Sequence, residues 1–184
     1  MLTDLAPALK GGLRMAAAGV FADAFGRIRK GVHDVVDFRK PSELWYRPDS
    51  QANSIAWLVW HLTRIQDDHL AGVAGTEQVW AAKGWMERFG LPFDPLATGY
   101  GHTSDEVAAV QVAGELLTAY HDAVYQETII YVKGLVDADL GRIVDASWDP
   151  PVTLGVRLVS VVSDGLQHAG QAAYILGLAE RLTS

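Results

Sequence analysis

The sequence predicts an all-α protein: a four-helix bundle with crossover connections and a short extra helix in the 75–100 loop. Four long segments place apolar residues at spacings of three and four, which is typical of amphipathic helices. Proline or glycine separates these segments. No segment alternates apolar and polar residues beyond a few positions, as a strand would. The length of 184 residues suits one domain, 1–184.

The first helix is expected from about Ala6 to Phe38, ending before Pro41 because proline cannot continue a helix. A break near Gly31 is an open alternative, since each glycine costs a helix up to about 1 kcal/mol relative to alanine. The apolar repeat of this helix consists of Leu9, Leu13, Ala16, Val20, Ala24 and Ile28.

A loop over Pro41–Asn53 precedes the second helix, which Asn53 or Ser54 caps and which runs to about Ala71. Gly72 and Gly75 end it. Its expected inward side chains are Ile55, Leu58, Leu62 and Ile65.

The segment 72–101 is irregular and aromatic, and a short helix is expected within it over Gln78–Phe89. Its aromatic residues suggest a lid over a site or a contact between two copies of the chain. Thr103-Ser104-Asp105-Glu106 forms a capping box and opens a third helix to about Lys133. After a connection containing Asp149-Pro150-Pro151, a fourth helix is expected from about Thr153 to Leu182.

Composition excludes several function classes. The net charge of −7 and the absence of a basic run argue against a nucleic-acid partner. The chain has no cysteine, so disulfides, thiolate metal ligands and a cysteine nucleophile are excluded. The N-terminal residues 1–7 do not resemble a secretion signal, and no apolar run is long enough to span a membrane. A cytoplasmic protein is therefore expected.

The strongest functional signal is a possible metal site formed by His61, Asp164 and His168. Four residues separate Asp164 from His168, so on a helix both side chains leave the same face. His61 lies in the apolar run Trp57–Leu62 of the second helix. Two imidazoles and one carboxylate are a ligand set of catalytic divalent-metal sites that keep an open position.

Simpler interpretations of the same residues remain open at this stage. Asp164 and His168 would also be compatible with a buried ion pair, or Asp164 could point to solvent. His61 could be a hydrogen-bonded core histidine. The placement of both motifs near the middle of their helices is what favours a shared metal site, because helical bundles build such sites between facing helices.

Other polar residues are assigned around this site. Gln171 lies one turn after His168 and is the first candidate to orient it, while Asp68 shares the face of His61 and is a candidate to orient that ring or a bound water. Trp57 and Arg64 are candidates to line a pocket, with Trp45 and Trp60 near its mouth. Arg47, Arg64 and Arg157 are candidates to hold an anionic group.

The remaining histidines are weaker candidates for ligands. His69 is expected to be exposed or at the rim of the site. His121, beside Asp122, could contribute to the site, but a surface position is expected. His33 and His102 lie near helix or loop ends and are expected to be solvated.

The runs Trp57-Leu58-Val59-Trp60-His61-Leu62 and His168-Ala169-Gly170-Gln171 resemble the DinB-like superfamily of four-helix-bundle metalloproteins over nearly the whole chain. That superfamily includes the YfiT-like proteins, the bacillithiol and mycothiol S-transferases, and the metal-binding domain of mycothiol-dependent maleylpyruvate isomerase. Many members carry a histidine four residues before the last one, where this chain has Asp164; the isomerase has a carboxylate there. The resemblance implies His61, Asp164 and His168 as ligands of a divalent metal, with zinc preferred and nickel possible, and a homodimer.

Three functional hypotheses follow. The first is an S-transferase or isomerase that activates a low-molecular-weight thiol at the metal; the Ala/Gly/Val-rich, Lys-poor composition indicates a high-GC genome and hence mycothiol as the co-substrate. The second is a zinc hydrolase with Asp68 or His69 as base. The third is a non-catalytic, dimeric, metal-binding stress protein.

Overall fold

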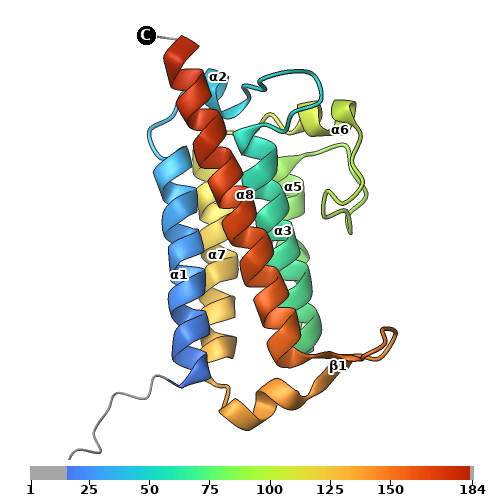
Figure 1. Cartoon of the computed structure of the whole chain (residues 1–184). Helices are drawn as coiled ribbons and strands as arrows, with labels where there is room; N and C mark the ends of the chain where they lie inside the picture. The colour runs from blue at the N-terminus through green and yellow to red at the C-terminus, as the bar shows by residue number, and fades with distance from the viewer. Residues whose placement is uncertain (1–15, 183–184) are drawn as a thin grey trace, which may run out of the picture.

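The computed structural model describes residues 16–182, and within them it is an all-α bundle, as predicted (Figure 1). Four long helices form the bundle: α1 (Ala17–Val36), α3 (Ile55–Ala74), α7 (Gly114–Lys133) and α8 (Leu154–Leu182). Residues 6–15, which the sequence assigned to the first helix, lie outside the described residues. None of the described helices is both long and apolar enough to cross a membrane.

The order of the helices around the bundle is not their order in the chain. α1 packs against α7 and α8, and α3 packs against the same two helices, so α1 lies diagonally across from α3. α3 and α7 run in the same direction, and α8 runs opposite to both (Figure 1). The predicted crossover connections are therefore present, because neither the first and second nor the third and fourth long helices are principal neighbours.

The connections contain more regular structure than the sequence predicted. The expected loop 41–53 begins with a short helix, α2 (Pro41–Leu44). The single helix expected over 78–89 is two short helices, α4 (Val79–Ala82) and α5 (Trp85–Phe89), because Gly84 between them adopts a left-handed conformation that interrupts the helix. The last connection contains the 3₁₀ helix η1 (Asp137–Gly141) and two paired antiparallel strands, β1 (Ile143–Asp145) and β2 (Val152–Thr153).

The capping box at Thr103 is confirmed, but the helix that it opens is short. The Thr103 side chain accepts a hydrogen bond from the backbone N–H of Glu106, and α6 (Ser104–Ala109) follows. The chain then breaks at 110–113 before α7 begins at Gly114. The predicted helix to Lys133 is thus two helices, because the buried side chains of Val110 and Val112 anchor the break in the core.

The second helix, α3, is buried on almost every side. Ser54 caps it as predicted, accepting from the backbone N–H of Trp57, but it continues past Gly72 and ends at the left-handed Gly75. Its buried residues include both apolar side chains and polar ones such as Arg64 and Asp67, so α3 is a core helix of the bundle. Here α7, α8 and the connection 75–113 cover it on three sides (Figure 1).

The aromatic segment 80–100 packs inward and is mostly part of the core. Trp80, Trp85 and Phe89 surround the ring of Tyr120, with ring centroids 5.0–5.6 Å apart. All four side chains are buried. Among the aromatic residues of the segment 80–100, only Tyr100 is largely exposed. The expected aromatic lid or dimer contact is therefore not what most of these residues form.

Close packing of α1 against α8 depends on Gly165. A Cβ atom at this position would lie 2.8 Å from Cδ1 and 3.3 Å from Cγ2 of Ile28. Gly177 in the same helix has no atom within 4 Å of the corresponding position.

We predict that Gly165→Val lowers the free energy of unfolding by about 1–3 kcal/mol, because a larger side chain overfills a close-packed contact. Gly177→Ala is the matched control in the same helix and should raise stability by up to about 1 kcal/mol, because alanine favours the helix and meets no neighbour. Urea unfolding of both variants measures the difference. Equal effects in the two variants would contradict the packing argument.

Candidate metal centre

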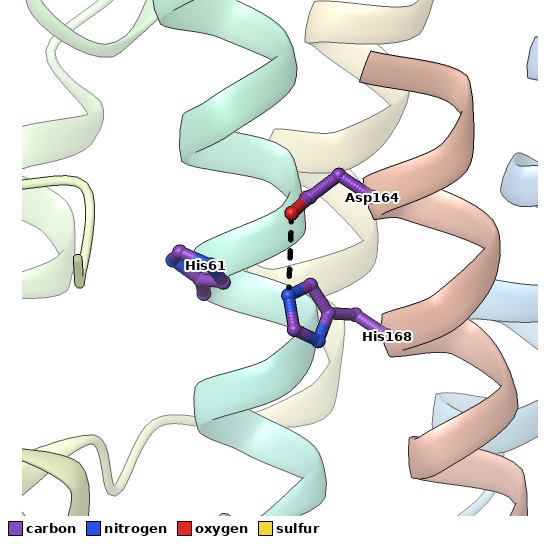
Figure 2. Close-up of side chains that lie close together, drawn as sticks. All are labelled: His61, Asp164 and His168. Atoms are coloured by element: carbon purple, nitrogen blue, oxygen red, sulfur yellow. Dashed lines mark ion pairs between the residues drawn. The ribbon is translucent and has the colours of Figure 1, made fainter. Parts of the chain in front are cut away.

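The structure brings His61, Asp164 and His168 together from two antiparallel helices (Figure 2). One donor atom from each residue lies within 4.8 Å of the others. Nε2 of His168 is 3.4 Å from Oδ1 of Asp164, and the two imidazole rings meet edge to face with centroids 4.9 Å apart. Among the described residues, this is the one group of three His, Asp or Glu side chains with such spacing.

Each imidazole is held through its Nδ1 atom. Nδ1 of His61 is 2.5 Å from the carbonyl oxygen of Thr98, and Nδ1 of His168 is 2.8 Å from Oε1 of Gln171. Since both acceptors hold a proton on Nδ1, Nε2 is the nitrogen left for a metal ion on each ring. Such a partner for the second ring nitrogen is usual around histidine ligands.

The donor set fits a divalent ion. Oδ2 of Asp164 is buried and has no hydrogen-bond partner among the described residues. A buried carboxylate oxygen without a partner is costly, and a bound cation removes that cost. Two imidazoles and one carboxylate are ligands that zinc accepts, and three protein ligands leave a position for an outside molecule.

Burial and charge set the protonation of the two histidines in opposite directions. Burial lowers the pKa of His61 below 6.5 and outweighs its other contacts. The hydrogen bond to Asp164 raises the pKa of His168 above 6.5. His61 is therefore the ring that stays neutral and ready to donate a lone pair over the wider pH range.

The site opens on the side of α8. His61 is 6% exposed, and Trp57 stacks on its ring at 4.7 Å with an angle of 13° between the planes. The side chain of Asp164 is 30% exposed and that of His168 is 18% exposed. A surface hollow of about 440 Å³ reaches Asp164 along the outer face of α8. It is lined by Val156, Val159, Ser160, Ser163, Asp164 and Gln167.

A second hollow, of about 470 Å³, lies elsewhere. It is formed by residues of α3, α4 and α7, among them Leu70, Val79 and Val124, and contains none of the three metal donors. Its polar wall residue Asp67 already accepts hydrogen bonds from Val79, Trp80 and Tyr120. The carboxylate of Asp67 is therefore already used to hold the fold together.

Of the two residues predicted to orient the histidines, one does so and the other does not. Gln171 holds His168, as its spacing suggested. Asp68 instead accepts a hydrogen bond from Gln78 at 2.7 Å, and the backbone carbonyl of Thr98 holds His61 in its place. Thr98 was missed because a backbone acceptor in an irregular segment leaves no side-chain signal; the neighbouring Gly99 and Gly101 were the only hint of a close approach.

The predicted arginines already have protein partners. Arg64 is fully buried and donates to the carbonyl of Ala97 and to Gln78. Arg47 binds backbone carbonyls of its own loop and Ser104. Arg157 pairs with Asp145 at 3.0 Å and lies 3.4 Å from Nδ1 of His69, a half-buried residue near the site.

The tryptophans at the predicted mouth also differ from one another. Trp57 lies against His61, as described above. Trp60 is buried and stacks on His102. Trp45 is partly exposed and donates to the carbonyl of Val112.

Three other histidines are less exposed than predicted. His121 is completely buried and lies 3.0 Å from the hydroxyl of Thr63. His102 stacks on Trp60 and accepts from Trp57. His33 contacts Asp37 and Asp122. The surface assignment of His121 was wrong because helix position alone did not show which neighbours would cover its ring, whereas His33 and His102 remain partly exposed.

The comparisons with known proteins agree with this architecture. The family model of the DinB superfamily matches residues 24–172, and the chain belongs to this superfamily. A crystal structure of a conserved protein from Enterococcus faecalis is similar, with a TM-score of 0.84 and 28% identity, covering 90% of this chain and 98% of that one. No curated protein sequence matches the chain.

The buried His121 predicts a specific pH dependence of stability. Burial lowers its pKa from 6.5 to about 4, so between these values the unfolded chain binds a proton that the folded chain excludes. Stability should therefore fall as the pH drops from 6.5 to about 4. At about 1.4 kcal/mol per pKa unit, His121→Gln should remove a pH-dependent loss on the order of 3 kcal/mol. Urea unfolding at a series of pH values, with a chelator present, measures it.

His33 provides a control of opposite sign. Burial alone would lower its pKa, but the hydrogen bonds to Asp122 and Asp37 together raise it above 6.5. Its contribution is present below pH 6.5 and is lost as the pH rises through the raised value. His33→Gln should thus leave the acid slope intact. An acid slope unchanged in His121→Gln would contradict the assignment.

Proposed function

We propose, from membership of the DinB superfamily and the three converging donors, that this protein is a metal-dependent enzyme with its divalent ion on His61, Asp164 and His168. Zinc is the proposed metal, and nickel is the alternative, since both accept imidazole ligands. The observation that carries the proposal is that a carboxylate oxygen of Asp164 lies with two imidazoles whose Nδ1 atoms are already hydrogen-bonded, while Oδ2 of the same carboxylate is buried without a partner.

The proposed reaction is transfer or isomerisation through a low-molecular-weight thiol of the mycothiol type. A divalent ion in this set supplies Lewis acidity, which lowers the pKa of a thiol or water at its open position. In the reaction the thiol S–H bond breaks and its proton passes to water. Sulfur then bonds to an electrophilic carbon, which releases a leaving group or takes up a proton on a neighbouring atom.

The chain's own residues supply binding and orientation for this reaction. Thr98 and Gln171 hold the two rings, and Trp57 excludes water from one side of His61. The thiol must come from outside because the chain has no cysteine. The hollow beside Asp164 is the proposed entrance, and its serine and glutamine side chains offer hydrogen bonds to a polar co-substrate.

Hydrolysis is the competing reaction at the same ion. The residues predicted as its base are engaged elsewhere: Asp68 with Gln78, and His69 with Arg157. A hydrolase would act without any added thiol. Thiol dependence therefore separates the two reactions.

We predict that the purified chain binds about one equivalent of zinc and that His168→Ala loses most of it, since removing one of three ligands leaves an incomplete set. Arg181→Ala is the control in the same helix, because Arg181 lies at the far end of α8, outside the hollow, and donates to the backbone carbonyl of Gly177. Elemental analysis measures the metal, and a mycothiol-type thiol with a generic electrophile measures conjugation.

Loss of both zinc and conjugation in His168→Ala, with Arg181→Ala unchanged, supports the proposal. Turnover of an ester or amide without thiol would shift the assignment to a hydrolase. Bound metal without any turnover would favour a binding protein. Absence of zinc from wild type, even after its addition, would sink the metal centre itself.

A homodimer also remains a proposal, and α8 offers a face for it. Leu166 and Tyr174 are exposed on this helix and do not line the hollow beside Asp164. A second copy covering that face would bury apolar surface that a monomer leaves in water. Light scattering should then give twice the monomer mass for wild type and a smaller mass for Leu166→Lys; a monomeric wild type would contradict the proposal.

A further inference from the structure

The segment 97–102, here named the strap, is tied to three successive turns of α3. Nε1 of Trp57 donates to Nδ1 of His102 at 3.2 Å. Nδ1 of His61 lies 2.5 Å from the carbonyl oxygen of Thr98. Nε of Arg64 donates to the carbonyl of Ala97 at 3.1 Å. Two adjacent carbonyl groups of the strap thus meet two side chains that are one helical turn apart.

We propose that Arg64 is a positioning residue of the metal centre. By fixing the carbonyl of Ala97 it holds the next carbonyl, that of Thr98, against His61. This inference rests on the metal-binding function proposed above, and it adds a residue that touches neither the ion nor a substrate.

The carbonyl of Thr98 determines which tautomer His61 adopts. A carbonyl oxygen only accepts hydrogen bonds, so the nitrogen facing it must carry the proton. With the proton on Nδ1, the lone pair lies on Nε2, which is then the ring nitrogen available to a metal ion. A displaced carbonyl would allow the other tautomer, whose protonated Nε2 cannot bind a metal ion.

Arg64 is rigid enough for this task. Its side chain is fully buried, and Nη1 donates to Oε1 of Gln78 at 2.9 Å and to the hydroxyl of Tyr120 at 3.3 Å. The guanidinium lies 4.9 Å from the ring centroid of Trp80 and 3.6 Å from the carboxylate of Asp67. These contacts leave the Ala97 carbonyl little freedom to move relative to α3.

Gly99 gives independent support for the close approach of the strap. Its φ of +96° lies in a region that residues with a Cβ rarely adopt. A Cβ atom there would lie 2.8 Å from Nδ1 of His61 and 3.0 Å from the ring of Trp60. The Thr98–His61 hydrogen bond therefore requires glycine at the following position.

The test is ¹⁵N NMR of the histidine side chains in the metal-free full chain, followed by zinc titration calorimetry. Wild type should show His61 protonated on Nδ1. Arg64→Met and Gly99→Ala should each show a mixture of tautomers and bind zinc about 10- to 100-fold more weakly, the usual loss when the partner of a histidine ligand is removed. Arg64→Lys, which keeps one donor, should restore part of both properties.

Arg142→Met is the matched control. Arg142 also donates to a backbone carbonyl, that of Val73 at 3.1 Å, but at the opposite end of α3. It should retain the wild-type tautomer and zinc affinity. Circular dichroism checks folding, and if Arg64→Met does not fold, Arg64→Lys decides, because it keeps the buried charge; a folded Arg64→Lys with the wild-type tautomer and zinc affinity would then overturn the role of Arg64.

The outcomes separate this inference from the proposed function. Folded Arg64→Met and Gly99→Ala with the wild-type tautomer and zinc affinity would overturn the role of the strap. A single His61 tautomer in wild type that is lost in both variants, in a chain that binds no zinc, would overturn the metal function and leave the positioning of His61 supported.

Discussion

The parallel direction of α3 and α7 is the constraint on which the rest of the structure depends. Because both helices run the same way, residues 75–113 must return along the length of the bundle before α7 can begin (Figure 1). This return covers the side of α3 that α7 and α8 leave open. It converts a helix at the edge of a bundle into a core element, and it brings an irregular backbone segment beside His61.

The polar residues buried in α3 in turn bind and position the connection 75–113. Asp67 accepts from the backbone N–H groups of Val79 and Trp80, which opens α4. Arg64 and His61 meet the carbonyls of residues 97 and 98. Burial of these groups is tolerable only when they are hydrogen-bonded, so each one fixes a different part of the connection. The histidine of the metal centre is one member of that series.

The sequence predicted the parts of the fold that depend on periodicity. α3 and α8, and with them the meeting of His61 with the Asp164/His168 pair, follow from apolar spacing and from caps such as Ser54. The sequence did not predict the helix ends that depend on tertiary contacts. The capping box at Thr103 correctly marked a helix start, but nothing local showed that Val110 and Val112 would be drawn into the core and end that helix.

The same distinction explains the site. Gln171 could be found because its partner, His168, is one turn away in the same helix. The partner of His61 is 37 residues distant and is a main-chain oxygen, which every residue possesses. His121 was assigned to the surface because its burial depends on how α3 and α7 meet, and a helical pattern alone does not give that.

His61 and His168 are therefore held in different ways. His61 is 6% exposed and is held by a distant segment that itself is tied to α3 at two further points. His168 is held by an exposed side chain of its own helix, next to the hollow that reaches Asp164. One side of the centre is thus fixed by the fold, and the other faces the solvent. In the proposed reaction, a co-substrate arriving from the α8 side would meet Asp164 and His168 first, while the fixed imidazole of His61 would keep the position of the ion. Substrate choice would then depend on the outer residues of α8, and retention of the metal on the connection that covers α3.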